Sequence, residues 1–192
     1  MSKIRTAVFI SGNGSNLQAL IDAAKDPNYP AEIALVISNK ADAYGLTRAR
    51  EAGIATEVID HTQFETRDDF DGELHVALLS HDIQFICLAG FMRVLTPTFV
   101  AEWSGAMINI HPSLLPSHKG LNTHAAVLKA GDKQHGCTVH WVTPGVDEGD
   151  IIAQSVLDVL PGDTAESLKE RVHALEHALY PKTLAEVLVN FV

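Results

Sequence analysis

The sequence is short of cysteine, of basic residues and of long apolar runs, and each shortage excludes a class of protein. Only two of its 192 residues are cysteines, and Cys87 and Cys137 form no CxxC pair, so a disulfide scaffold is excluded and a reducing cytoplasm is expected. Lysine and arginine number 14 against 24 acidic residues. The resulting net charge of −10 argues against nucleic acids or anionic membranes as partners.

No stretch reaches about 18 consecutive apolar residues, so no membrane-spanning helix is expected. The apolar start at residues 4–10 is too short for a signal peptide, which also favours a cytoplasmic protein. With 192 residues, 46% of them hydrophobic, the chain can bury a core without disulfides or a structural metal. We therefore expect one domain over residues 1–192.

Short apolar runs alternate with amphipathic stretches over the first 110 residues, a pattern typical of βαβ units and a parallel sheet. The runs predict strands at 4–10, 33–38, 56–59, 83–89 and 107–110. The amphipathic stretches between them predict helices at 16–25, 43–52 and 67–80, and a short helix that opens at Thr96-Pro97.

The pattern changes in the last third of the chain. Residues 138–142 and 151–159 predict two strands that extend the sheet in antiparallel fashion, and residues 164–189 predict a long helix that Pro181 kinks or splits. The expected fold is therefore an α/β, Rossmann-like open sheet. It is mostly parallel, with antiparallel strands added in the C-terminal part and helices on both faces.

The loop SGNGSN at residues 11–16 follows the first strand, and a helix begins at its end. Gly12 and Gly14 allow a tight turn, and the helix N–H groups can hold a phosphate monoester. A nicotinamide site is disfavoured because Leu17 replaces the third glycine and no acid ends the second strand. A purely structural turn remains an alternative.

Asn109 and His111 are two residues apart in the fifth strand, so they share a face at its carboxyl end. An amide can stabilise a developing oxyanion, and a histidine can do the same while moving a proton. Asp147 follows a later strand, and a carboxylate brought near His111 would favour its charged form. The alternative is a set of ordinary polar residues at strand ends and in a solvated turn.

A second histidine motif, HALEH at residues 173–177, formally matches the HxxEH pattern of a zinc-protease class. No third protein ligand stands out except Glu186, so we expect no metal site. The motif is better explained as a polar helix face, or as Glu176 reaching the ligand edge of the sheet.

Three segments together resemble the phosphoribosylglycinamide formyltransferases, the folate-dependent glycinamide ribonucleotide transformylases. They are SGNGSNL at 11–17, AGFMRVL at 89–95 and NIHPSLLP at 109–116, followed by Gly120 and Thr123-His124. The resemblance runs from about residue 4 to 181. It implies that a formyl group passes from 10-formyltetrahydrofolate, a co-substrate, to the amine of glycinamide ribonucleotide in purine biosynthesis. It also implies a monomer or homodimer with small-molecule partners and no metal.

The resemblance assigns roles by position in this sequence. The phosphate-binding βαβ part would occupy about residues 1–105, and the catalytic and folate-binding part about 106–192. The catalytic residues would be Asn109, His111 and Asp147. Substrate contacts would come from Gly14, Ser15, Asn16, Gly90, Pro112, His173 and Glu176. The folate site would use Arg67, Met92, Arg93, Val94, Leu95, Asn109, Thr143, Pro144, Gly145, Val146 and Asp147.

The chain departs from the family pattern at Lys119, Asn122 and Asp150, where a proline, a histidine and a proline are common, and it stops at Val192. These departures concern loop shape and rate more than reaction type. Methionyl-tRNA formyltransferases share the histidine motif but need a further carboxyl-terminal domain and a basic surface. Two competing functions stay open at this point: a formyltetrahydrofolate deformylase and a non-catalytic nucleotide-binding domain.

Overall fold

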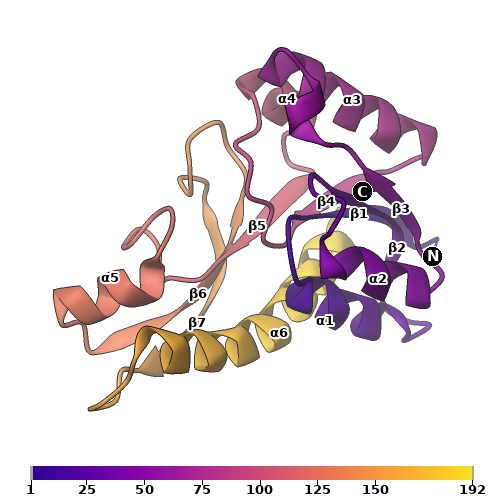
Figure 1. Cartoon of the computed structure of the whole chain (residues 1–192). Helices are drawn as coiled ribbons and strands as arrows, with labels where there is room; N and C mark the ends of the chain where they lie inside the picture. The colour runs from indigo at the N-terminus through magenta and orange to yellow at the C-terminus, as the bar shows by residue number, and fades with distance from the viewer. Residues whose placement is uncertain (1, 192) are drawn as a thin grey trace.

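Seven strands form one sheet in the order β3-β2-β1-β4-β5-β6-β7. The structure is a computed structural model that describes residues 2–191 (Figure 1). The strands are β1 (Ile4–Ile10), β2 (Ala31–Ser38), β3 (Ala55–Val58), β4 (Phe85–Leu88), β5 (Met107–His111), β6 (Gln134–Trp141) and β7 (Ile151–Asp158). The helices are α1 (Ser15–Ala24), α2 (Tyr44–Glu51), the 3-10 turn η1 (His61–Gln63), α3 (Arg67–Ser80), α4 (Pro97–Glu102), α5 (Thr123–Ala130) and α6 (Ala165–Val189).

The first five strands are parallel, and β6 and β7 add to the β5 side in antiparallel fashion. The predicted fold class is therefore confirmed. The chain builds outward from β1 to β2 and β3 on one side, and from β4 to β7 on the other. Loops that leave β1 and β4 consequently diverge, which opens a crevice at the carboxyl ends of these strands.

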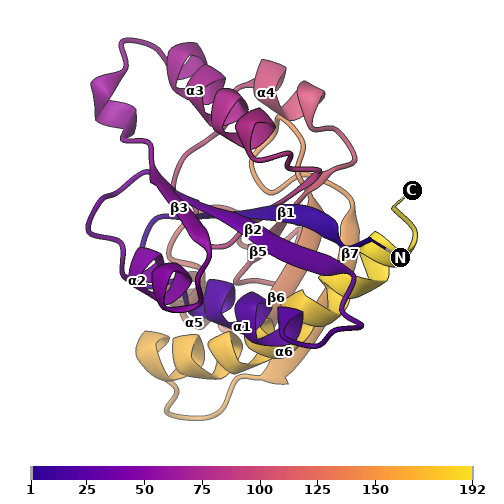
Figure 2. The same cartoon turned by 90° about the vertical axis from the view of Figure 1, so that its right-hand side faces the viewer.

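Helices cover both faces of the sheet because side chains of a strand alternate between its faces (Figure 2). Val8 and Ile10 join the apolar cluster shared with α1, α2 and α6. Ala7 and Phe9 join the cluster on the other face, shared with α3 and α4. Burial on both faces explains why the central strands are nearly continuous apolar runs. No helix within residues 2–191 combines the length and the apolar content needed to cross a bilayer.

Two elements of the C-terminal half differ from the prediction. β6 begins at Gln134 rather than 138, because the buried residues His135 and Gly136 hide its start from an apolar-run criterion. Helix α5 was not predicted. It is a short helix, and the Asn122 side chain does not cap its start. The one clear sign of this helix in the sequence was Gly131, a glycine that ends it with the left-handed φ of 73°.

Pro181 does not split the long helix, so the first of the two predicted effects, a kink, is the one that stays a prediction. Helix α6 runs from Ala165 to Val189 with Pro181 inside it. Tyr180 and Leu184 on either side of the proline are fully buried, so packing anchors the helix to the core on both sides of Pro181. Thr183 adds a hydrogen bond from its Oγ1 to the carbonyl oxygen of Leu179, at 2.8 Å.

Tyr180 joins this helix to the sheet. Its side chain is fully buried, and its hydroxyl hydrogen is shared between the carbonyl oxygens of Leu88 in β4 (2.9 Å) and Ile108 in β5 (3.2 Å). Both strands end at the crevice, so this contact helps to fix its floor.

We predict that Tyr180→Phe lowers the free energy of unfolding by about 1–2 kcal/mol, because two carbonyl groups lose a partner inside the core. Urea denaturation followed by circular dichroism measures the effect. Tyr44→Phe is the control, since Tyr44 is 52% exposed. Equal stability of the two variants would show that the hydroxyl contributes nothing.

Candidate active site

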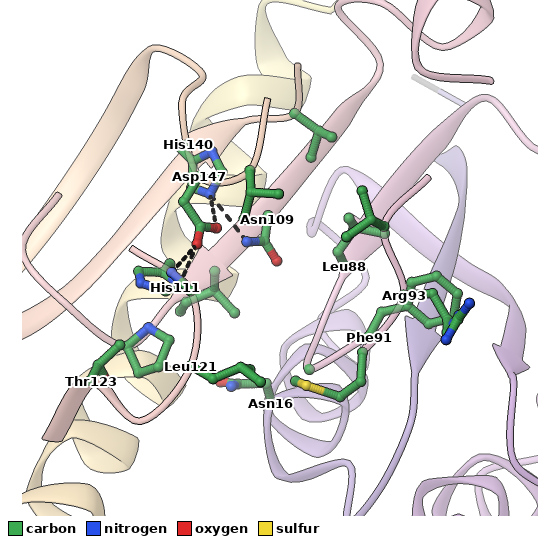
Figure 3. Close-up of a pocket in the computed structure, with 18 of the residues that line it drawn as sticks. Asn16, Leu88, Phe91, Arg93, Asn109, His111, Leu121, Thr123, His140 and Asp147 are labelled. Atoms are coloured by element: carbon green, nitrogen blue, oxygen red, sulfur yellow. Dashed lines mark hydrogen bonds and ion pairs between the residues drawn. The ribbon is translucent and has the colours of Figure 1, made fainter. Parts of the chain in front are cut away.

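A cavity of about 590 Å³ lies at the carboxyl ends of β4 and β5, between the β1–α1 loop and the loop that follows β6 (Figure 3). Most residues predicted for the site line it: Asn16, Gly90, Met92, Arg93, Val94, Leu95, Asn109, His111, Pro112, Thr143, Pro144, Gly145, Val146, Asp147, His173 and Glu176. Gly14 and Ser15 lie next to Asn16 at the start of α1. Arg67 does not line the cavity.

The expected pairing of His111 with Asp147 is present. His111 Nδ1 lies 3.3 Å from Asp147 Oδ2, and both side chains are at least nine-tenths buried. The segment after β6 does not leave the sheet beside the end of β5, because β6 has the antiparallel direction that the sequence predicts. β6 is antiparallel, and the Val142 N–H donates to the carbonyl oxygen of Met107 at the start of β5. The loop must run back along β5 to carry Asp147 to His111.

The contacts of Asp147 hold it in this position. The Gly120 N–H donates to its Oδ2 at 2.9 Å, and its backbone has the left-handed φ of 52°. Burial alone would raise the pKa of Asp147. The Gly120 N–H and the His111 ring outweigh burial, and the pKa ends below that of an ordinary aspartate. Asp147 is therefore a buried carboxylate that stays ionised.

Both ring nitrogens of His111 have a partner. Nε2 donates to the carbonyl oxygen of His118 at 2.9 Å, because a carbonyl can only accept, and Nδ1 faces Asp147. Two acceptors on opposite sides of the ring suit the doubly protonated imidazolium. The loop from Ser117 to Asn122 therefore contacts the His111–Asp147 pair twice, at His111 through His118 and at Asp147 through Gly120.

His140 belongs to the same cluster and was not predicted. Its Nε2 lies 3.1 Å from Asn109 Nδ2 and 3.6 Å from Asp147 Oδ1, and its side chain is 3% exposed (Figure 3). His140 pairs with Asn109 in the β5–β6 register. The sequence feature that could have revealed His140 is the predicted antiparallel pairing of β5 with β6, because it places a β6 residue opposite each paired β5 residue.

The glycine loop approaches α2 closely. Gly14 has φ of 74°, and a Cβ built on it would lie 2.6 Å from the Cα of Gly45. The Gly45 N–H also donates to the carbonyl oxygen of Gly12 at 3.0 Å. Arg48 donates to the Asn13 carbonyl oxygen from Nε and to Asn13 Oδ1 from Nη2. These contacts fix the loop that carries the N–H groups at the start of α1.

Glu176 reaches the cavity from α6, at the ligand edge of the sheet where the sequence predicts it. Asn16 Nδ2 donates to its Oε2 at 2.9 Å. Burial raises the pKa of Glu176, and the hydrogen bond from Asn16 lowers it by a smaller amount, so that the pKa is about 7. Burial lowers the pKa of His173, and the neighbouring His177 lowers it further. Among residues 2–191, no group of three or more His, Cys, Asp and Glu side chains is arranged to hold a metal ion.

The loop after β4 is fixed from two sides. The Met92 N–H donates to Ser11 Oγ at 2.7 Å, and Ser11 Oγ donates to Asn39 Oδ1, so this loop is tied to the ends of β1 and β2. Arg67 acts from outside the cavity, where its Nη2 donates to the carbonyl oxygen of Val94 at 2.6 Å. Arg67 thus supports the lining rather than forming it.

The three internal departures from the family pattern all lie in loops. Lys119 forms an exposed ion pair with Glu148 at 3.0 Å, which joins the loop after β5 to the loop after β6. Asn122 has φ of 59°, a conformation that asparagine tolerates better than most residues. The Asp150 side chain is exposed, and its carbonyl oxygen accepts from the Trp141 N–H.

Sequence reasoning also missed several lining residues. They are mostly apolar residues or members of the loop and helix after β5: Leu88, Phe91, Val100, Ile110, Gly120, Leu121, Asn122, Thr123, His124, Val142 and Lys169. The apolar ones resemble ordinary core residues in the sequence. Lys169 lies on α6, and the remaining residues lie in α5 or the loop before it. The cavity wall is therefore more apolar than the predicted set alone would make it.

A family model described as formyl transferase matches residues 4–184. The chain belongs to the formyl transferase family. Phosphoribosylglycinamide formyltransferase from Escherichia coli K12 is 47% identical over 178 residues, which cover 93% of this chain and 84% of that protein. The crystal structure of phosphoribosylglycinamide formyltransferase from Brucella melitensis is 49% identical, covers 97% of this chain and 96% of that chain, and superposes with a TM-score of 0.94.

This formyl transferase chain also matches part of much longer proteins. The trifunctional purine biosynthetic protein adenosine-3 from Chironomus tentans is 50% identical over 192 residues, covering 99% of this chain and 14% of that protein. The human protein of the same name is 51% identical over 182 residues, which cover 95% of this chain and 18% of that protein. The chain thus spans less than a fifth of these two relatives.

The titration of Glu176 predicts a stability effect with a defined sign. The folded protein keeps its proton up to about pH 7, whereas the unfolded chain releases it near the ordinary value of 4.5. Between these pH values the folded state binds more protons, so this residue makes the free energy of unfolding fall as pH rises.

Glu176→Gln removes this loss. We expect the variant to be more stable than the wild type by on the order of 2 kcal/mol at pH 8, with the difference vanishing toward pH 4.5. Urea denaturation at both pH values measures it, with Glu170→Gln on the exposed side of α6 as the control. A pH-independent difference would contradict the elevated pKa.

Proposed function

We propose that this chain transfers a formyl group from 10-formyltetrahydrofolate to the amine of glycinamide ribonucleotide, a step of purine biosynthesis. The observation that carries the proposal is the convergence of Asn109, His111 and Asp147 on one cavity that also receives the start of α1 through Asn16. The names of the relatives that cover nearly the whole chain support it.

The phosphate of the ribonucleotide would bind at the start of α1. Gly14, Ser15 and Asn16 offer unpaired N–H groups in the first turn, and the positive end of the helix dipole favours an anion there. A dianionic phosphate can be bound in this way without a basic patch. Glu176, which accepts a hydrogen bond from Asn16, would meet the ribose or the glycinamide group beside it.

The folate would occupy the part of the cavity between the loops after β4 and β6. Its apolar wall, including Leu88, Phe91 and Val94, suits the flat pteridine ring, and the backbone of residues 143–147 supplies polar groups at its edge. Arg93 would meet the carboxylates of the glutamate tail. The folate supplies the formyl carbon when bound, and both halves of the chain contribute to holding it.

The side chains then have distinct roles in the transfer. The neutral amine attacks the formyl carbon, and negative charge develops on the formyl oxygen. Asn109 would donate a hydrogen bond to that oxygen, and His111 would add a positive charge and a second donor once its Nε2 hydrogen leaves the His118 carbonyl. Asp147 would keep His111 protonated and would receive the proton of the amine. As the oxyanion returns to a carbonyl, the bond between the formyl carbon and the folate nitrogen would break, and the proton would pass to that departing nitrogen. The formyl group passes directly between the two substrates without a covalent bond to Asp147 or another residue. Because no covalent enzyme intermediate accumulates, we expect no burst phase in the kinetics.

One absorbance assay of folate product tests the proposal. The purified chain is mixed with 10-formyltetrahydrofolate with and without glycinamide ribonucleotide. We expect product only when the ribonucleotide is present. Product without it would identify a deformylase-type hydrolase, and folate binding without any product would identify a binding domain; either result rejects the proposal.

Asp147→Asn tests the mechanism. The amide cannot hold a positive charge on His111, so we expect kcat to fall by about a hundredfold or more, while KM for the ribonucleotide changes by less than about threefold. Asp150→Asn in the same loop is the control, since its side chain is exposed. Turnover at the wild-type rate would remove Asp147 from the mechanism.

A further inference from the structure

His140 is a buried titratable residue inside the site. The proposed mechanism assigns it no role. It lies on β6, directly opposite Asn109 on β5. Its side chain is 3% exposed, and the two titratable groups that face this corner are Asp147 and His111. A buried polar ring between a catalytic amide and a catalytic carboxylate calls for a specific bonding arrangement.

The carbonyl oxygen of Trp141 fixes the tautomer of this ring. It lies 2.8 Å from His140 Nδ1, and because a carbonyl can only accept, Nδ1 must carry a hydrogen. In the neutral ring, Nε2 is then an acceptor. The Asn109 Nδ2–H group fills this role at 3.1 Å, whereas Asp147 Oδ1 at 3.6 Å lies outside hydrogen-bond reach of Nε2.

This arrangement decides which end of the Asn109 amide faces the reaction. The two ends of a carboxamide have nearly the same shape, but one donates and the other accepts. With His140 as an acceptor, the nitrogen of Asn109 lies on the side of Asp147 and His111, and its oxygen points away from them (Figure 3). The second hydrogen of Nδ2 stays free for the formyl oxygen. In the reversed orientation, the amide oxygen would repel the developing negative charge.

We propose that His140 is a positioning residue of formyl transfer, which fixes the Asn109 carboxamide in its donor orientation. This inference rests on the proposed function. If the inference is right, the hydrogen bond between His140 and Asn109 lowers the activation barrier of formyl transfer only through its effect on Asn109. Loss of His140 should therefore reduce kcat, leave KM for both substrates nearly unchanged, and matter little once Asn109 is gone.

Two conservative variants separate positioning from simple packing. The glutamine side chain of His140→Gln reaches the place of Nε2 and can accept from Asn109, whereas the shorter side chain of His140→Asn reaches only the place of Nδ1. We expect His140→Asn to lower kcat by about tenfold to a hundredfold with KM within about threefold, and His140→Gln to recover most of the loss. His135→Asn, a buried histidine of the same strand, is the control and should keep kcat.

A double-mutant cycle completes the kinetic test. In an Asn109→Ala background, His140→Asn should cost less than about threefold in kcat, because the group that it positions is absent. An equal loss in both backgrounds, a loss confined to KM, or failure of His140→Gln to recover activity would overturn the proposal. Circular dichroism and urea denaturation of each variant identify any loss that comes from unfolding.

A spectroscopic measurement separates this inference from the proposed function. Nitrogen-15 NMR of the ligand-free protein at pH 7.5 should show His140 as the neutral ring with hydrogen on Nδ1, assigned by its absence in His140→Gln. A doubly protonated ring would overturn the proposal, whatever the activity. If the NMR result is as expected but the wild type transfers no formyl group, then the proposed function fails and with it the kinetic role, while the amide orientation stands.

Discussion

The site depends on one antiparallel register, the pairing of β5 with β6. It sets Asn109 against His140 and His111 against Thr138. The loop after β6 must return along β5, and the return brings Asp147 between the two histidines, 3.3 Å from one and 3.6 Å from the other. A carboxylate at this depth is costly unless it is paired and hydrogen-bonded. The Gly120 N–H and the His111 ring meet that requirement, which explains how Asp147 stays ionised while mostly buried.

The loops around this register hold backbone conformations that most residues avoid. Of the four non-glycine residues with positive φ among residues 2–191, three lie beside the cavity: His118, Asn122 and Asp147. Each such residue costs of order 1 kcal/mol and persists only where surrounding contacts enforce it. Two of the enforcing contacts are the hydrogen bonds to His111 and Asp147. The folded loops and the His111–Asp147 pair therefore stabilise each other, and a change in either is expected to move both.

The sequence was sufficient for the parallel part of the fold and for the residues that follow its strands. Asn109, His111 and the glycine loop were identified because parallel strands bring their carboxyl ends to one edge, which a linear pattern reveals. His140 and the return path of Asp147 were not, since both depend on which strand pairs with β5 and in which register. That choice is made by packing between distant segments. Helix α5 was missed for a related reason: it packs on α6 and has little periodicity of its own.

The proposed function requires a protein with a net charge of −10 to bind a phosphate group without repelling it through its own acids. The structure achieves this locally. The start of α1 supplies N–H groups, and the acid nearest to it, Glu176, has its pKa raised to about 7 by burial, so it carries only part of its charge at neutral pH. The ionised acid of the site, Asp147, sits on β6's side of the cavity beside two histidines. Full negative charge is thus kept next to His111, where it favours the imidazolium, and is reduced beside the helix start, where an anion would bind. In the proposed function, this separation of a charged from a half-neutral carboxyl group would allow one small cavity both to receive a phosphate monoester and to stabilise an oxyanion.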